Sequence, residues 1–179
     1  MRRRRAVQRY GGKAVGTLVA SLLLSALPLY RSTAQSVPDS ASRLLAVAAD
    51  SGAPLETRVA ALRALRGHCA EAMLPTLTAL ADPYRRPWVL WHEAMAGLSE
   101  CASPELAPYW RDMITFPREP VRELAIVGLA RTGVAGDREL LGEVMHREDD
   151  PYLRRLGAWA DSLLRLPHAA RARAEPPRL

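Results

Sequence analysis

The two cysteines of this sequence, Cys69 and Cys101, are 32 residues apart, and each follows a helical segment by three or four residues. In an oxidising compartment, two cysteines at matching turns of adjacent structural units form a disulfide. The alternative is a pair of buried thiols, because packed helices lie about 8–10 Å apart whereas bonded cysteines need Cα atoms within about 7 Å. The sequence favours the disulfide, because turns can converge where helix axes cannot.

Zinc binding is a second chemistry that these cysteines suggest, since His68 and His92 supply further ligands of the right types. The spacing argues against it, because no Cys-x-x-Cys or His-x-x-x-His pair is present. Two exposed histidines beside a disulfide explain the same residues. We therefore expect no metal and no cofactor.

Aromatic and arginine side chains that could bind another protein are concentrated in one part of the chain. The sequence has four tryptophans but a single phenylalanine. Exposed Trp, Tyr and Arg dominate the binding energy of protein interfaces, whereas the alternative is that such rings fill the core. We expect Trp88, Trp110 or both to be partly exposed. The candidate partner-binding residues are Arg85, Arg86, Trp88, Trp91, His92, Tyr109 and Trp110.

Acidic residues could in principle act in pairs as general acid and base. In helical proteins such charges mostly lie on solvated faces or pair with arginine. The sequence also has no Gly-x-Ser-x-Gly elbow, phosphate-binding loop or dinucleotide fingerprint. We therefore expect no catalytic residues and no enzymatic activity. The acids considered are Glu93, Glu100, Glu105, Asp112, Glu119 and Glu123.

A repeat of about 32 residues must position these side chains. Four helical segments align with one another, at 57–65, 90–98, 121–129 and 153–161. Small and apolar residues three, four and seven positions apart mark one buried face of each segment, and the small residues let a neighbouring helix approach closely. One column holds Arg58, Trp91, Arg122 and Arg154, with spacings of 33, 31 and 32 residues. A second column holds Ala61, Ala94, Ala125 and Gly157.

Further helical segments are predicted at 38–49, 73–81, 104–115 and 137–145, and no alternating strand pattern is present. Gly67 and Gly133 are predicted to follow helices in the left-handed conformation that favours glycine. Asp82, Ser103 and Asp150 each precede a proline and are predicted to cap the next helix. The sequence therefore predicts an all-α fold.

The segments Pro120-Val121-Arg122-x-x-Ala125-x-x-x-Leu129 and Thr57-Arg58-x-x-Ala61-x-x-x-Leu65 carry a family resemblance. The chain from about 54 to 164 resembles HEAT repeats, in the short bacterial form also found in phycobilisome lyases. It departs from that pattern at Trp91, and again at Gly157 and Asp161 in the last repeat. The resemblance implies a right-handed, armadillo-like α-solenoid of antiparallel helix pairs that binds a partner. The second helix of each pair would line a concave surface, and the exposed Trp88 or Trp110 is expected near that side. A lyase-like or chromophore-handling enzyme is the alternative.

The first 34 residues are typical of a secretory signal peptide. A basic opening, Arg2–Lys13, precedes the uncharged run Ala14–Leu29, and small residues follow at Ser32–Ala34. Cleavage between Ala34 and Gln35 would give an exported protein, periplasmic or extracellular. The alternative is an uncleaved anchor and a membrane-tethered scaffold, although the 16-residue run is shorter than the roughly 20 residues that span a bilayer.

The net charge of +6 is confined to this leader. Residues 1–34 hold seven cations and no acid, whereas the other 145 residues hold 18 arginines against 19 acids. That balance gives no overall field for nucleic acid, so we expect a protein or peptide partner for a non-catalytic scaffold. The expected organisation is a signal peptide at 1–34, a capping helix at 35–53, HEAT-like repeats at 54–166 and a flexible tail at 167–179.

Overall fold

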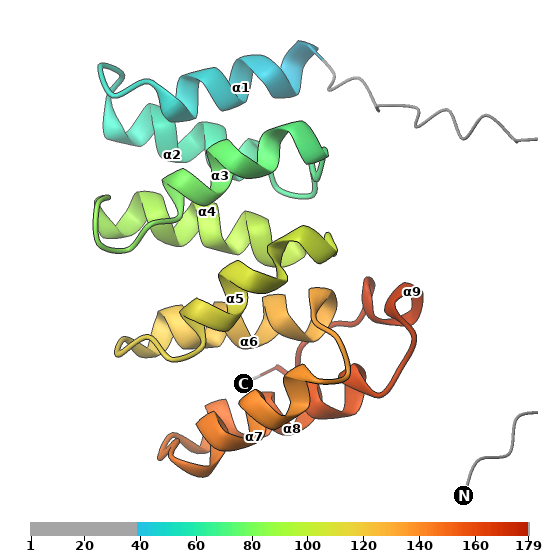
Figure 1. The fold of residues 1–179 in the computed structure, drawn as a ribbon. Helices are drawn as coiled ribbons and strands as arrows, with labels where there is room; N and C mark the ends of the chain where they lie inside the picture. Colours follow the sequence, from blue (N-terminus) through green and yellow to red (C-terminus); the bar gives the residue numbers. More distant parts are fainter. Residues whose placement is uncertain (1–38, 179) are drawn as a thin grey trace, which may run out of the picture. The chain divides into compact units, whose positions relative to one another are not determined.

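The computed structural model describes residues 39–178, and all regular structure in that range is helical (Figure 1). The predicted all-α fold is thus confirmed for these residues, whereas the predicted signal peptide and its cleavage site at Ala34 and Gln35 lie outside them. Across residues 39–178, no helix has both the length and the hydrophobicity needed to cross a membrane.

The α-helices are α1 Asp39–Ala49, α2 Leu55–Ala64, α3 Leu74–Leu80, α4 Trp88–Glu100, α5 Ala107–Met113, α6 Glu119–Thr132, α7 Asp137–His146, α8 Pro151–Leu164 and α9 His168–Arg171. Short 3₁₀ turns, η1 Glu71–Met73 and η2 Pro104–Leu106, precede α3 and α5.

The helices form two layers. The helices with the repeat columns, α2, α4, α6 and α8, lie side by side in chain order as one layer. The other layer consists of α1, α3, α5 and α7, which pack mainly against α2, α4, α6 and α8 respectively. Figure 1 shows these pairs following one another from α1/α2 to α7/α8. One continuous apolar core runs between the layers.

The arginine column has one structural role at three of its four positions. Arg58, Arg122 and Arg154 each donate a hydrogen bond to a backbone carbonyl in the segment that precedes their own helix. Carbonyl groups near the C-terminal end of a helix lack hydrogen-bond partners within the helix. A cation nearby is also attracted to the negative end of the helix dipole. Trp91, the fourth member, is buried instead, at 2% exposure. The acceptors are the carbonyls of Ala48 (3.0 Å), Pro117 (3.0 Å) and Glu148 (3.2 Å).

The small-residue column lies in the core as predicted. Ala61, Ala94 and Ala125 are each at most 4% exposed. At Gly157 there is no room for a side chain, because a Cβ there would overlap the side chain of Met145 on α7. The close approach of α7 and α8 therefore requires a glycine at position 157, the last member of the column.

The two glycines predicted to end helices differ from each other. Gly67 adopts a left-handed conformation with φ of +76°, which confirms the prediction. The prediction for Gly133 is wrong, because its φ is −64°. Glycine is needed there for space, since a Cβ would lie 2.7 Å from the carbonyl oxygen of Leu129 and 2.7 Å from a carboxylate oxygen of Asp137.

The three predicted caps also differ. Asp150 caps α8 by accepting hydrogen bonds from the second and third backbone N–H groups beyond it, at 2.7 and 2.9 Å. Ser103 makes no side-chain capping bond at the start of η2, so that prediction is wrong. Asp82 accepts the N–H of Tyr84 at 2.9 Å within a turn, and the next helix begins only at Trp88.

The C-terminal segment is partly packed, although the sequence predicted a flexible tail at 167–179. Helix α9 contacts α6 and α8. Arg171 of α9 is only 5% exposed, and its Nη1 donates to the carbonyl of Gly133 at 2.7 Å. The guanidinium therefore satisfies a free carbonyl at the end of α6, which fixes the segment in place.

Ion pairs join successive helix pairs. Glu93 of α4 is 7% exposed and accepts hydrogen bonds from Arg63 of α2 and from Arg66 in the turn after α2, at 2.9 and 2.7 Å. Burial alone would raise the pKa of the Glu93 carboxyl, but the two guanidinium groups bring it below its usual value. This acid, considered above for catalysis, is thus held in a structural pair. Similar pairs are Arg111–Asp137 and Arg122–Glu148, whereas Arg138–Asp161 joins α7 and α8 within one helix pair.

Candidate interaction surface

Large aromatic side chains are exposed on the loop between α3 and α4 and on the first turn of α4. The side chain of Tyr84 is 77% exposed and that of Trp88 is 59% exposed, and His92 is partly exposed one turn later. Arg85 is exposed and Arg86 partly exposed between them. We call these five residues the aromatic patch. The expectation that Trp88, Trp110 or both are partly exposed is met by Trp88.

The rings of the patch rest on buried rings beneath them. The ring centroid of Trp88 lies 5.2 Å from that of His92 and 6.2 Å from that of buried Trp91. Tyr84 packs on Phe116, with centroids 4.9 Å apart, and Phe116 itself is 5% exposed on the loop between α5 and α6. The patch is therefore supported from two neighbouring helix pairs. Phe116 is not among the predicted contact residues, because its being the sole phenylalanine gives no signal of this role.

The conformation of the loop explains why these rings face solvent. The Asp82 carboxylate accepts the N–H of Tyr84 and lies 3.5 Å from the guanidinium of Arg85. Pro83 is buried, and Pro87 directly precedes the first residue of α4. Two prolines and a side-chain turn restrict the backbone. The aromatic side chains are thus presented with little conformational entropy left to lose on binding.

Three of the predicted contact residues are part of the core instead. Trp91 and Trp110 are 2% and 0% exposed, so the prediction that they contact a partner is wrong. Tyr109 is half-buried, and its hydroxyl donates to the carbonyl of Ala81 at the end of α3, at 3.0 Å. Burial, together with the charge of Asp82, raises the Tyr109 pKa far above its usual value, so the hydroxyl stays a donor.

The prediction that Cys69 and Cys101 form a disulfide is confirmed, with Cα atoms 5.3 Å apart. The bond joins the turn after α2 to the turn after α4. Both cysteines are therefore unavailable as zinc ligands, and His68 is exposed. Within residues 39–178, no three His, Cys, Asp or Glu side chains are grouped closely enough to hold a metal ion.

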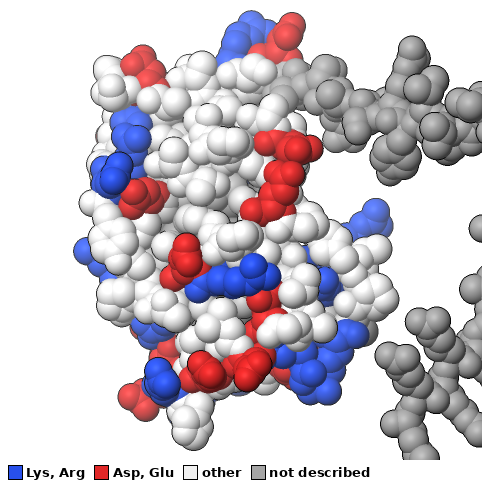
Figure 2. All heavy atoms as spheres, viewed as in Figure 1, with Lys and Arg blue, Asp and Glu red and all other residues white. Residues whose placement is uncertain are grey.

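The remaining acids considered for catalysis are spread over the surface. Glu123 is partly exposed and accepts a hydrogen bond from the Tyr152 hydroxyl at 2.9 Å. Burial and this carboxylate raise the pKa of Tyr152 to about 12. Glu105 lies beside Glu71, whose charge raises the Glu105 pKa, and both side chains are exposed. Glu100, Asp112 and Glu119 are exposed as well. On the face drawn in Figure 2, charges of both signs occur in separate small groups.

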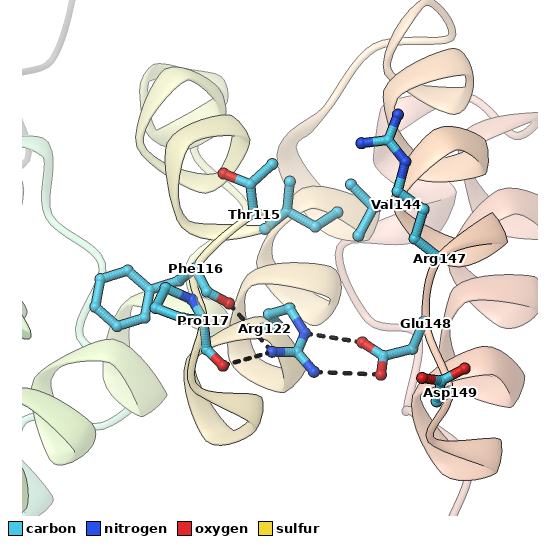
Figure 3. A pocket seen from close by; sticks show the side chains of 9 residues that line it. Thr115, Phe116, Pro117, Arg122, Val144, Arg147, Glu148 and Asp149 are labelled. Atoms are coloured by element: carbon cyan, nitrogen blue, oxygen red, sulfur yellow. Dashed lines mark hydrogen bonds and ion pairs between the residues drawn. The ribbon is translucent and has the colours of Figure 1, made fainter.

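A hollow of about 380 Å³ lies between the α5–α6 loop and the α7–α8 loop (Figure 3). Arg122 faces Glu148 across it with two hydrogen bonds, of 2.8 and 3.2 Å, and also donates to the carbonyls of Phe116 and Pro117. The polar groups at its centre thus satisfy one another. The hollow shares Phe116 with the base of the aromatic patch. Its lining residues are Ile114, Thr115, Phe116, Pro117, Arg122, Val144, Arg147, Glu148 and Asp149.

Replacing Glu148 with glutamine is expected to destabilise the protein by about 1.5–3 kcal/mol at neutral pH, because the charge-assisted bonds to Arg122 are lost. Burial would raise the pKa of Glu148, but hydrogen bonds from Arg122 and from the backbone lower it. A carboxyl with a lowered pKa stabilises the fold fully above its unfolded-state pKa, near 4.5, and loses this contribution as the pH falls through the folded-state value.

The urea midpoint should therefore fall less steeply below pH 5 in Glu148→Gln than in the wild type. The matched control is Glu143→Gln, an exposed position on α7, which should follow the wild-type curve. Parallel curves for the wild type and Glu148→Gln would show that the Arg122 pair contributes nothing to acid sensitivity.

Comparisons with protein-family models, with curated proteins and with solved structures find no match to this chain. Its most distinctive surface is the aromatic patch, where two large rings are exposed on a restrained loop.

Proposed function

We propose that the protein is an exported, non-catalytic scaffold that binds a protein or peptide partner through the aromatic patch. The observation that carries this proposal is the exposure of both Tyr84 and Trp88, four residues apart in the sequence, at 77% and 59%. Each ring rests on a buried ring, so neither is a mobile side chain that happens to face solvent. Supported aromatic side chains beside arginine are the composition of binding hot spots.

The scaffold is proposed to be a short right-handed α-solenoid of HEAT-like repeats. Two findings support this: the helix pairs follow one another in two layers, and the arginine column makes the same kind of contact at three positions. The polar surface of α8 supports it too, since Arg154 and Arg155 are exposed there. A terminal repeat needs such a polar side, because no further repeat covers it.

Export is supported by the disulfide and by the leader sequence. A bond between Cys69 and Cys101 persists in an oxidising compartment and is rare in the cytosol. The basic start and short apolar run of residues 1–34 suit a secretory signal. The periplasm or the extracellular space is therefore the proposed location.

The chemistry of the patch indicates what kind of surface it fits. Trp88 and Tyr84 offer apolar ring faces, and Arg85 and Arg86 add positive charge beside them. A partner loop or peptide with an apolar side chain next to a carboxylate would satisfy both features. Because the loop is already restrained by Pro83 and Pro87, binding would cost little ordering of the scaffold.

Photo-crosslinking in cells tests the proposed function. With p-benzoylphenylalanine in place of Trp88, we expect a covalent adduct of one defined mass, because this position would lie against the partner. The same group in place of Ala158, which is exposed on α8, is the matched control and should give no such adduct. Adding Tyr84→Ala to the Trp88 variant should reduce the adduct at least about tenfold, the effect of a hot-spot residue.

Two outcomes would contradict the proposal. One is the same set of adducts from position 88 and from position 158, which would indicate nonspecific collision. The other is an adduct at position 88 that is unaffected by Tyr84→Ala, since the two rings are proposed to form one binding surface.

A further inference from the structure

The segment after α9 contacts the helical layers at Ala174. Ala174 packs on the core, and its carbonyl accepts a hydrogen bond from Nη2 of Arg131 on α6, at 3.0 Å. Residues 174–178 have no helix or strand. Upstream, Arg171 anchors the segment by donating to the carbonyl of Gly133. Figure 1 shows the chain turning back from α9 toward the C-terminus beside α6. A stretch without secondary structure is thus held at Ala174, and the helix that precedes it is held at Arg171.

Arg131 is the residue that contacts this stretch directly. Its Nη1 donates to the carbonyl of Ser99 near the end of α4, at 2.6 Å, while Nη2 donates to Ala174. The side chain is half-buried, its Nε is buried without a partner, and burial lowers the pKa of the guanidinium. A cation in such surroundings needs its acceptors, because an unpaired buried donor is costly. The carbonyl of Ala174 is one of two hydrogen-bond acceptors that Arg131 has among the described residues.

The sequence of the segment suits recognition in an extended form. Pro176 and Pro177 fix their own backbone angles and have no N–H group, which disfavours a helix interior or a central strand for this stretch. Extended proline-containing segments are bound through their carbonyl groups and the apolar faces of their rings. Both prolines are only partly exposed. The backbone contact from Arg131 depends little on side-chain identity, so another polypeptide of this kind could make it.

We propose that the surface around Arg131, where α4 and α6 end, is a binding site for an extended proline-containing polypeptide segment, and that residues 174–178 of the chain occupy it in cis. The site is separate from the aromatic patch. Trp88 begins α4, whereas Ser99 lies near its other end, about 17 Å further along the helix axis. An external segment of the same chemistry must displace the tail, which acts as a built-in competitor.

A spin label on the tail tests this in the full-length chain. Both native cysteines are bonded to each other, so Arg178→Cys introduces the single reactive thiol. We expect strong paramagnetic broadening of the amide signals of Ser99 and Arg131, and none in α1. The probe is an unlabelled peptide with the sequence of residues 172–179. It should restore the signals in a saturable manner at millimolar concentration, since a tethered segment has an effective concentration on the order of millimolar.

Two substitutions show whether Arg131 carries the contact. Arg131→Met should reduce the broadening severalfold while the far-ultraviolet circular dichroism stays that of the folded chain. Arg173→Met removes an exposed arginine from the same segment and is the matched control, for which the broadening should persist. If Arg131→Met fails to fold, the peptide competition in the otherwise unchanged chain still decides the question.

Three results would overturn the proposal. The first is the absence of broadening at Ser99 and Arg131, which would mean that the tail does not occupy this surface. The second is broadening that the peptide does not relieve, which would make the contact part of the fold rather than a site. The third is broadening seen only between separately labelled copies of the chain, which would make the occupant a second copy. None of these results bears on the aromatic patch.

Discussion

Replacing Gly128 with alanine is expected to lower the free energy of unfolding by about 1–3 kcal/mol, whereas the same change at Gly97 leaves it unchanged or raises it by up to about 1 kcal/mol. The two glycines hold the same position in successive repeats, on α6 and α4. A Cβ at Gly128 would overlap the indole of Trp110, which is 0% exposed. Nothing lies within 4 Å of a Cβ at Gly97, so alanine there brings only its better helix propensity.

Urea unfolding followed by far-ultraviolet circular dichroism measures both effects. Trp110→Leu provides an internal check, because it removes the indole ring that a Cβ at Gly128 would meet. The Nε1 of Trp110 has no hydrogen-bond partner, so this change removes no hydrogen bond. The double variant should therefore be more stable than the sum of the single effects predicts. Equal effects of Gly128→Ala and Gly97→Ala would contradict the steric explanation.

This pair of glycines also shows what the sequence could and could not predict. Aligning the repeats identifies the column of small residues that face a neighbouring helix, such as Ala61, Ala94 and Ala125. The alignment does not distinguish Gly97 from Gly128. The difference comes from Trp110, which lies on another helix and has no equivalent ring in the preceding repeat. The repeat alignment therefore cannot show that Gly128, but not Gly97, contacts a tryptophan ring.

The caps of α4 and α8 show a second limit. Asp82 and Asp150 both precede Pro-Tyr, yet only Asp150 caps a helix. The physical difference is Pro87, because a proline disfavours the helical conformation of the residue before it, here Arg86. The helix is therefore delayed to Trp88, and the residues between become the exposed loop of the aromatic patch. The sequence did contain a signal for the exposed loop, because Pro87 has no equivalent in the stretch after Pro151.

The burial of the tryptophans and the packing of the tail could not be predicted locally, because both depend on contacts between residues far apart in the sequence. Helix α5 has seven residues, about two turns, so its periodicity could not decide whether Trp110 faces the core or solvent. Similarly, α9 is held by Arg171 bonding to Gly133, 38 residues earlier. The composition of residues 167–179 predicted a flexible, solvated tail that includes Arg171. Local patterns therefore predicted the helices well, but not which exceptional side chains pack between them.

Reducing the disulfide is also expected to lower the free energy of unfolding substantially. The bond between Cys69 and Cys101 closes a segment of 32 residues that includes α3 and α4. By the chain-entropy model, such a loop stabilises the folded state by about 3–4 kcal/mol, because it restricts the unfolded chain. Reduced wild-type protein should therefore unfold at a lower urea concentration than oxidised protein. Coincident unfolding curves would contradict this expectation.

Substitution separates the bond from the packing of its sulfur atoms. Cys101 is 1% exposed, whereas Cys69 is exposed, so only one of the two fills space in the core. The variant with both Cys69→Ala and Cys101→Ala should lose the contribution of the bond and, in addition, about 1 kcal/mol of packing relative to the reduced wild type. Cys69→Ala alone should match the reduced wild type, because the sulfur of Cys101 stays in place.

The effect of reduction should also be unevenly distributed along the chain. Helices α1, α2 and α3 contact the later helices mainly through α4, and the disulfide reinforces that junction from the turn after α2 to the turn after α4. In stacked helix pairs, stability is approximately a sum of local terms and contacts between neighbours. Amide hydrogen exchange on reduced protein should therefore accelerate more in α1–α3 than in α6–α8. Uniform acceleration across both groups would instead mean that the described helices unfold as one cooperative unit, with the bond acting only on the unfolded chain.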